Sequence, residues 1–165
     1  MKKGIQPVSP GQRDLEGEST AAFSLRTFSV VVGWGDCDPA QIAYTARIPD
    51  WALKAIEDWY RYCLMSGWFE MNIKRGIGTP FVALSCEFHA PVRPDLALEM
   101  KTFVTRLGNA SLSHLVEGFQ LGIHCFSVAA TAAFVDANTM KPTPIPNNMR
   151  RNILQYIDNQ GRAFP

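Results

Sequence analysis

The chain has 165 residues, of which 47% are apolar and 19% charged, and its 16 lysines and arginines nearly balance its 15 aspartates and glutamates. This length suits one domain, and a near-zero net charge argues against a broad nucleic-acid-binding surface. No apolar run is long enough to span a bilayer, and the basic first residues are not followed by the apolar stretch of a signal peptide. Four cysteines without a C-x-x-C pair argue against a disulfide scaffold or zinc ribbon. We therefore expect a soluble, cytoplasmic protein.

Residues 1–22 are rich in Pro, Gly, Ser and charged side chains and show no hydrophobic periodicity. Such a segment cannot bury enough apolar surface to offset the entropy that it would lose on ordering. We therefore expect a flexible N-terminal tail over residues 1–22 and one folded domain over residues 23–165.

The first regular element is a strand, which the alternation of apolar residues predicts from Phe28 onward. One side of this strand is expected to carry Phe28, Val30, Val32 and Trp34. The strand runs into a cluster of turn-forming residues at 33–39, Gly-Trp-Gly-Asp-Cys-Asp-Pro.

Residues 49–67 predict a long helix with one apolar stripe. Pro49 suits its first turn, and Gly67 is expected to stop it. Trp59 and Tyr60 widen the stripe, so a broad apolar surface such as a curved sheet is needed to cover it.

The rest of the chain predicts four strands and a short final helix. The strands fall near residues 82–88, 96–105, 112–121 and 124–135, and a Pro-rich stretch at 142–146 opens the helix. This order of elements predicts an α+β fold, in which a five-stranded antiparallel sheet packs against one long helix.

The common catalytic and metal-binding motifs are missing from the sequence. There is no G-x-S-x-G elbow, no Walker A loop and no dinucleotide-binding glycine pattern after a strand. His89, His114 and His124 lack the spacing of metal ligands, and we interpret them as structural or surface groups. We therefore predict no metal and no cofactor.

One polar segment, residues 34–44, could carry chemistry. By composition alone it is a turn between a strand and a helix, and either of its aspartates, Asp36 or Asp38, could simply cap a helix. The residues alone leave these readings open.

The run Gly35-Asp36-Cys37-Asp38-Pro39-Ala40, then the long helix, then residues 75–80 entering a strand, resembles the 4-hydroxybenzoyl-CoA thioesterase group of the hotdog-fold superfamily. The resemblance covers residues 23–140. It implies a sheet wrapped around a central helix, a homodimer or dimer of dimers paired edge to edge, and active sites at the dimer interface. It also implies hydrolysis of an aryl or medium acyl-CoA thioester to the free acid and CoA.

The resemblance also assigns catalytic roles to residues of the polar segment. Asp38 is expected to be the catalytic carboxylate, either as nucleophile or as general base, and Asp36 a turn or capping residue. The backbone N–H groups of Tyr44 and Thr45, at the start of the helix, are expected to stabilise the oxyanion.

Substrate contacts follow from the same resemblance. Gln41 stands where the family usually has Gly, so that its side chain could narrow the pocket. The remaining expected contacts, which ordinary strand and turn polarity explains equally well, are Thr79, Ser85, Glu87 and Ser111. The aromatic residues Trp51, Trp68 and Phe69 either shape an acyl pocket or fill the core, and their usual burial favours the core.

Two alternatives remain. Related enzymes hold the CoA nucleotide with a basic cluster before the serine of the turn at 107–111, whereas here only Arg106 is near. Cations from elsewhere, such as Arg93 or Arg150, could replace the cluster, or the substrate could be a thioester on acyl carrier protein. The second alternative is a non-catalytic hotdog protein that binds acyl thioesters.

Overall fold

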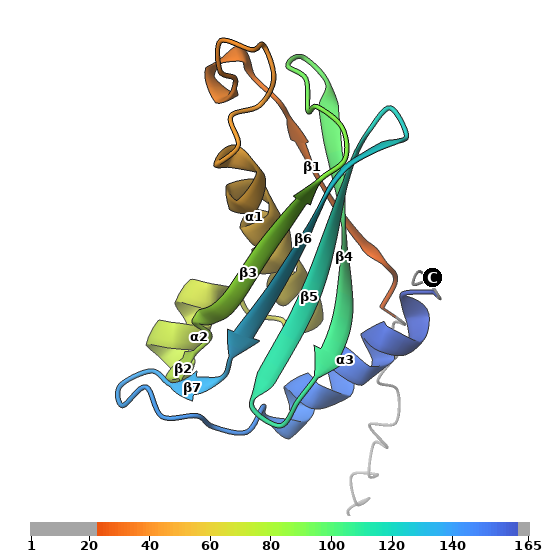
Figure 1. The fold of residues 1–165 in the computed structure, drawn as a ribbon. Helices are drawn as coiled ribbons and strands as arrows, with labels where there is room; N and C mark the ends of the chain where they lie inside the picture. The colour runs from red at the N-terminus through yellow and green to blue at the C-terminus, as the bar shows by residue number, and fades with distance from the viewer. Residues whose placement is uncertain (1–22, 162–165) are drawn as a thin grey trace, which may run out of the picture.

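The computed structural model describes residues 23–161, so the expected tail over residues 1–22 lies outside the described residues. The main sheet holds five strands in the spatial order β1-β4-β5-β6-β3, and all neighbouring strands are antiparallel (Figure 1). These strands are β1 (Arg26–Val31), β3 (Phe81–Phe88), β4 (Ala97–Leu107), β5 (Ser111–Gln120) and β6 (Ile123–Ala133).

Shorter elements surround this sheet. Two short strands, β2 (Ile77–Gly78) and β7 (Val135–Asp136), form a second sheet. The α-helices are α1 (Arg47–Cys63), α2 (Trp68–Arg75) and α3 (Asn147–Asn159), and the 3-10 helix η1 (Trp34–Asp36) follows β1. No helix in the described part of the chain is long and apolar enough to cross a membrane.

The expected α+β class is correct, but the expectation of one sheet and one long helix is incomplete. The helix expected over residues 49–67 ends at Cys63, and Gly67 precedes α2 instead of stopping α1. The sequence pattern did not reveal α2, because it has only two turns and fully buries only Met71. The first strand also ends earlier than expected, so Trp34 leaves the buried row and is 59% exposed.

Helix α1 lies along one face of the main sheet, which we call the inner face (Figure 1). Trp59 and Tyr60 are fully buried between the helix and this face, where they contact the ring of His114 on β5. Burying an aromatic side chain of this size contributes about 1.5–3 kcal/mol. The predicted aromatic stripe is therefore the main contact between helix and sheet.

The two edges of the main sheet differ. Helix α3 covers β4 at the start of β1: the Tyr156 hydroxyl donates to the Thr102 carbonyl at 2.5 Å and accepts the Arg26 N–H at 2.9 Å. The β3 edge is uncovered within the described residues, and it exposes Val82, Leu84 and Phe88. An uncovered edge presents unpaired backbone groups to which another strand can pair.

Three connections lie at the same end of the molecule as the N-terminus of α1 (Figure 1). They are residues 32–46, which we call the motif loop, residues 89–96 between β3 and β4, and the turn between β5 and β6. The polar segment 34–44, for which the sequence predicted chemistry, therefore lies at this end of the molecule, next to two other loops.

Candidate active site

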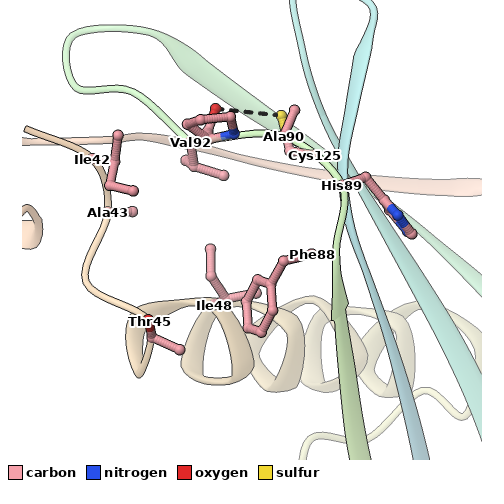
Figure 2. A pocket seen from close by; sticks show the side chains of 10 residues that line it. Ile42, Ala43, Thr45, Ile48, Phe88, His89, Ala90, Val92 and Cys125 are labelled. Atoms are coloured by element: carbon pink, nitrogen blue, oxygen red, sulfur yellow. Dashed lines mark hydrogen bonds between the residues drawn. The ribbon is translucent and has the colours of Figure 1, made fainter. Parts of the chain in front are cut away.

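A cavity of about 330 Å³ lies at the N-terminal end of α1, between the motif loop and the segment that follows β3. Ile48 from α1 and Phe88 from β3 line it on the side of the helix, Val92 lies away from the helix, and Thr45 stands at the start of α1 (Figure 2). The complete lining comprises Ile42, Ala43, Thr45, Ile48, Phe88, His89, Ala90, Pro91, Val92 and Cys125. The cavity is therefore mainly apolar, with the first backbone groups of a helix at one side.

Asp36 holds the first half of the motif loop. Its Oδ2 accepts a hydrogen bond from the Gly33 N–H at 3.1 Å, and its Oδ1 lies 3.2 Å from Nε of Arg47. Its backbone carbonyl accepts the Tyr44 N–H at 2.8 Å. These contacts confirm Asp36 as a turn and capping residue.

Asp38 is held more loosely. Its Oδ1 accepts the Ala40 N–H at 2.8 Å, which closes a local turn before the loop bends back. Its backbone N–H donates to the Ile42 carbonyl at 3.0 Å. Within the described residues Oδ2 accepts no hydrogen bond, and the side chain is half-buried. Asp38 does not line the cavity itself, and its link to the lining is the backbone hydrogen bond to Ile42. One carboxylate oxygen is therefore available for chemistry.

The two expected oxyanion donors differ. The Tyr44 N–H is already used, because it donates to the Asp36 carbonyl. The Thr45 N–H donates to no other described residue, and Thr45 lines the cavity just ahead of α1. Free N–H groups at a helix N-terminus favour negative charge, so the Thr45 amide is the better placed donor.

Gln41 lies on the other side of the motif loop. With Trp34 and Arg93 it lines a neighbouring cavity of about 510 Å³. Its φ of 64° is in the left-handed region, which glycine adopts without strain. Glycine at this position would therefore adopt the same backbone conformation with less strain than Gln41 does.

Thr79 belongs to a third cavity, about 530 Å³ in volume, between α1 and α2. Trp68 and Phe69 line the same cavity, whereas Trp51 is buried in the core. The core interpretation therefore holds for Trp51 and in part for Trp68, whose ring packs against Tyr60 and Phe81 at the border of the core, but not for Phe69, which is exposed.

The remaining expected substrate contacts lie away from the cavity at α1 within this protomer. Ser85 and Glu87 stand opposite Ala129 and Ser127 on the outer face of the sheet, which α1 does not cover. Ser111 begins β5 at the far end of the sheet from the motif loop (Figure 1).

Arg150, considered above as a phosphate ligand, has a structural contact. Its Nη2 donates to the carbonyls of Gly108 and Asn109 at 2.5 and 3.2 Å. It thereby fixes the turn between β4 and β5.

Two histidines that are distant in sequence meet on the outer face. Nε2 of His89 and Nε2 of His124 lie 3.2 and 3.1 Å from Oγ of Ser127. The His89 ring points away from the cavity, on the other side of β3 from Phe88 (Figure 2). Within residues 23–161, no group of three or more His, Cys, Asp or Glu side chains is arranged to hold a metal ion.

The thiols near the site are poor nucleophiles. Burial and the charges of Asp36 and Asp38 raise the pKa of Cys37. Burial also raises the pKa of Cys125, which lines the cavity. Because the thiolate is the reactive form, both cysteines are less reactive than an ordinary thiol at neutral pH. A carboxylate is therefore the better candidate for attack at this site.

Sequence reasoning missed the apolar walls of the cavity and the polar residue behind them, Gln120. A signal for Gln120 was present, because it continues the inward-facing row of Leu112, His114 and Val116 on β5. A polar residue at such a position requires a hydrogen-bonding partner, which here is the backbone of Arg93.

Comparison with known protein families gives a match over most of the chain. The family model described as the thioesterase-like superfamily matches residues 32–153. A curated relative, the 4-hydroxybenzoyl-CoA thioesterase of Pseudomonas sp. (strain CBS-3), is 30% identical over 74 residues. The match covers 44% of this chain and 52% of the relative, so the chain spans about half the length of the protein it matches.

Solved structures share the fold. A protein of the thioesterase superfamily from Jannaschia sp. CCS1 is 41% identical, with a TM-score of 0.77, and the match covers 81% of this chain and 94% of that chain. A 1,4-dihydroxy-2-naphthoyl-CoA thioesterase from Synechocystis is 19% identical, with a TM-score of 0.72 and coverage of 86% and 100%. At that identity the second likeness concerns the fold alone.

Proposed function

The chain belongs to the thioesterase-like superfamily, and from this premise we propose that it hydrolyses an aryl or medium acyl-CoA thioester to the free acid and CoA. The observation that carries the proposal is the arrangement of the motif loop. The loop holds Asp38 with one free carboxylate oxygen, and it then leads to Thr45, whose free amide stands at an apolar cavity. A carboxylate and an oxyanion donor beside an acyl-sized cavity are the parts that thioester hydrolysis needs.

Asp38 would act in one of two ways. As nucleophile, a carboxylate oxygen attacks the thioester carbon, the C–S bond breaks, and the CoA thiolate leaves and takes a proton. Water then cleaves the resulting anhydride, which releases the acid and restores Asp38. As general base, Asp38 instead accepts a proton from the water that attacks the same carbon.

The Thr45 amide would stabilise the oxyanion that either route forms. One such donor is worth about 2.7–4 kcal/mol in typical enzymes. The Tyr44 amide can contribute as a second donor only by releasing the Asp36 carbonyl. We therefore assign the main role to Thr45.

The site fits an apolar acyl group and a charged carrier. Ile48, Phe88 and Val92 would contact the acyl or aryl part in the cavity. Arg93 is exposed and lines the neighbouring cavity beside Gln41, where its cation could meet a phosphate. Because Arg150 is engaged by the turn at Gly108, Arg93 is the better candidate for the CoA nucleotide. A thioester on acyl carrier protein remains the alternative substrate.

A homodimer paired through β3 would complete the site. Phe88 at the end of this edge strand lines the cavity, so a second copy added there would lie next to it. Ser85 and Glu87 lie on the same edge strand, and we propose them as substrate contacts in the dimer only. Light scattering tests this: a purely monomeric, fully active protein would contradict the interface site.

The experiment that tests the function is hydrolysis of a panel of aryl- and aliphatic-CoA thioesters by wild type and Asp38→Asn, with direct detection of the acid product. Turnover that disappears in the variant would support a CoA thioesterase and rank its substrates. Turnover only with acyl carrier protein thioesters would favour the alternative substrate. No turnover with either class would leave a non-catalytic binding protein and reject the proposal.

A further inference from the structure

The segment that follows β3, residues 89–96, forms the wall of the cavity that faces α1 (Figure 2). The Val92 carbonyl in this wall accepts a hydrogen bond from the Ala43 N–H at 2.8 Å. Ala43 lies in the motif loop between Asp38 and Thr45. The position of Val92 therefore fixes the middle of the loop that carries both proposed catalytic groups.

Gln120, the last residue of β5, holds this wall through its side chain. Its amide oxygen accepts the Arg93 N–H at 2.8 Å, and its amide N–H donates to the Arg93 carbonyl at 2.9 Å. The side chain is 4% exposed. The two bonds use both backbone groups of the residue next to Val92. Without the amide these groups would lose their partners, which favours movement of the wall.

We propose that Gln120 is a positioning residue for thioester hydrolysis. By fixing Arg93 it keeps Val92, and through Val92 the Ala43 amide, in the place that sets Asp38 against the Thr45 amide. The inference rests on the proposed function of this site. It predicts a loss of kcat, because the loop that carries the proposed catalytic groups moves with the wall. It also predicts a smaller change in KM, because Val92 and Arg93 of the wall meet the substrate.

The chain supplies a matched control in Gln160. Its amide makes the same pair of hydrogen bonds with Val104, at 2.9 and 3.0 Å, and its side chain is similarly buried. Val104 stands opposite His114, on the part of β4 that lies beyond the first residue of β1 and has no partner from that strand. Gln160 thus has the same chemistry as Gln120 but lines none of the cavities described above.

Methionine tests the two amides, because it is close in shape and makes neither hydrogen bond. We expect Gln120→Met to lower kcat on an aryl-CoA ester by about 10- to 100-fold, since a misplacement of about 1 Å has effects of this size. We expect Gln120→Met and Gln160→Met to lower Tm by similar amounts, because each removes one buried pair of hydrogen bonds. Gln160→Met should leave kcat within about twofold of wild type, because no cavity wall moves. Equal kcat in the two variants would overturn the proposal.

Substitution by glutamate tests the role of Gln120 through the pH dependence of kcat, which a purely structural role would not change. A protonated carboxyl has the donor and acceptor pattern of the amide, whereas a carboxylate can only accept and would repel the Arg93 carbonyl. The kcat of Gln120→Glu, divided by that of wild type at the same pH, should therefore rise as the pH falls. The same ratio for Gln160→Glu should stay flat. A flat ratio for both variants would contradict the inference.

Amide hydrogen exchange separates the inference from the proposed function. Gln120→Met should speed exchange at the Ala43 N–H, and Gln160→Met should not. Unchanged protection of Ala43 would overturn the inference, whatever the activity. Wild type without turnover, or an active Asp38→Asn, would instead reject the proposed function and leave the exchange result to decide the role of Gln120.

Discussion

The two halves of the motif loop are held in different ways. In the first half, Asp36 uses both carboxylate oxygens and its carbonyl to bind Gly33, Arg47 and Tyr44. In the second half, Asp38 accepts one local hydrogen bond from Ala40. Two aspartates only two residues apart thus differ in how far the fold already uses them. The lesson is that the less engaged carboxylate is the one available for a reaction.

The halves also differ in the partners that hold them. The first half binds the start of α1 through Arg47 and the end of the 89–96 segment through Val32 and Trp34. The second half meets that segment at the cavity wall, through the single hydrogen bond from Ala43 to Val92. The first half therefore acts as a support, and the second positions the proposed chemistry.

The largest expected effect concerns the amide at the end of the loop. Thr45→Pro removes the N–H, and we expect kcat to fall about 100- to 1,000-fold, as for loss of one oxyanion donor. Thr45→Ala keeps the N–H and should retain activity. Steady-state kinetics on one aryl-CoA ester compare the two. Similar losses of kcat in both variants would mean that the Thr45 hydroxyl, and not the Thr45 amide, stabilises the oxyanion.

Acid should weaken the core through the buried His114. Burial lowers the pKa of His114 to about 3, from its ordinary value of 6.5. Between these values the unfolded chain binds a proton that the folded chain does not, so stability falls as the pH falls, by about 1.4 kcal/mol per pH unit at most. Denaturant unfolding from pH 7 to pH 4 measures this slope. His114→Phe should flatten it, and an unchanged slope would rule out His114 as the cause.

Removal of the Asp36 carboxylate should lower the stability of the protein more than its activity. We expect Asp36→Ala to lower the free energy of unfolding by about 1 kcal/mol, because the Gly33 N–H loses its acceptor and Arg47 its partner. Urea titration checks this value. Arg47→Gln breaks the ion pair alone and should cost less than Asp36→Ala. A larger loss in Arg47→Gln would place the support in the ion pair.

The smallest effect is expected at the bend of the second half. Gln41→Gly should raise the free energy of unfolding by about 0.5–1 kcal/mol, because glycine adopts the positive φ found there without strain. Gln41→Val should lower it. Tm measurements on both variants give the sign, and destabilisation by glycine would mean that the Gln41 side chain makes a stabilising contact.

Much of the fold followed from local patterns. The alternation in β3 and β4, the turns that bound β5 and the apolar run of β6 predicted strands, and the aromatic stripe of α1 predicted a helix. Helix α2 was not predicted, because two turns with one buried residue leave no clear period. The ends of elements also depended on long-range contacts that a local pattern does not contain.

The candidate site was predictable only where it is continuous in sequence. The motif loop was found from its own residues and its resemblance to a family, and Asp36 was assigned correctly as a cap. The cavity wall and Gln120 come from distant segments that only the fold brings together. For the same reason, sequence could not show that the Tyr44 amide is occupied or that His89 meets His124.

The most direct test of the central claim compares the loss of each aspartate's carboxylate in one experiment. The kcat on an aryl-CoA ester and the free energy of unfolding are measured for Asp38→Asn and Asp36→Asn, with direct detection of the acid. The account predicts that Asp38→Asn loses at least about 100-fold in kcat with near-native stability, as for loss of a catalytic carboxylate. Asp36→Asn should lose stability and keep most of its activity. An active Asp38→Asn beside an inactive, stable Asp36→Asn would contradict the account.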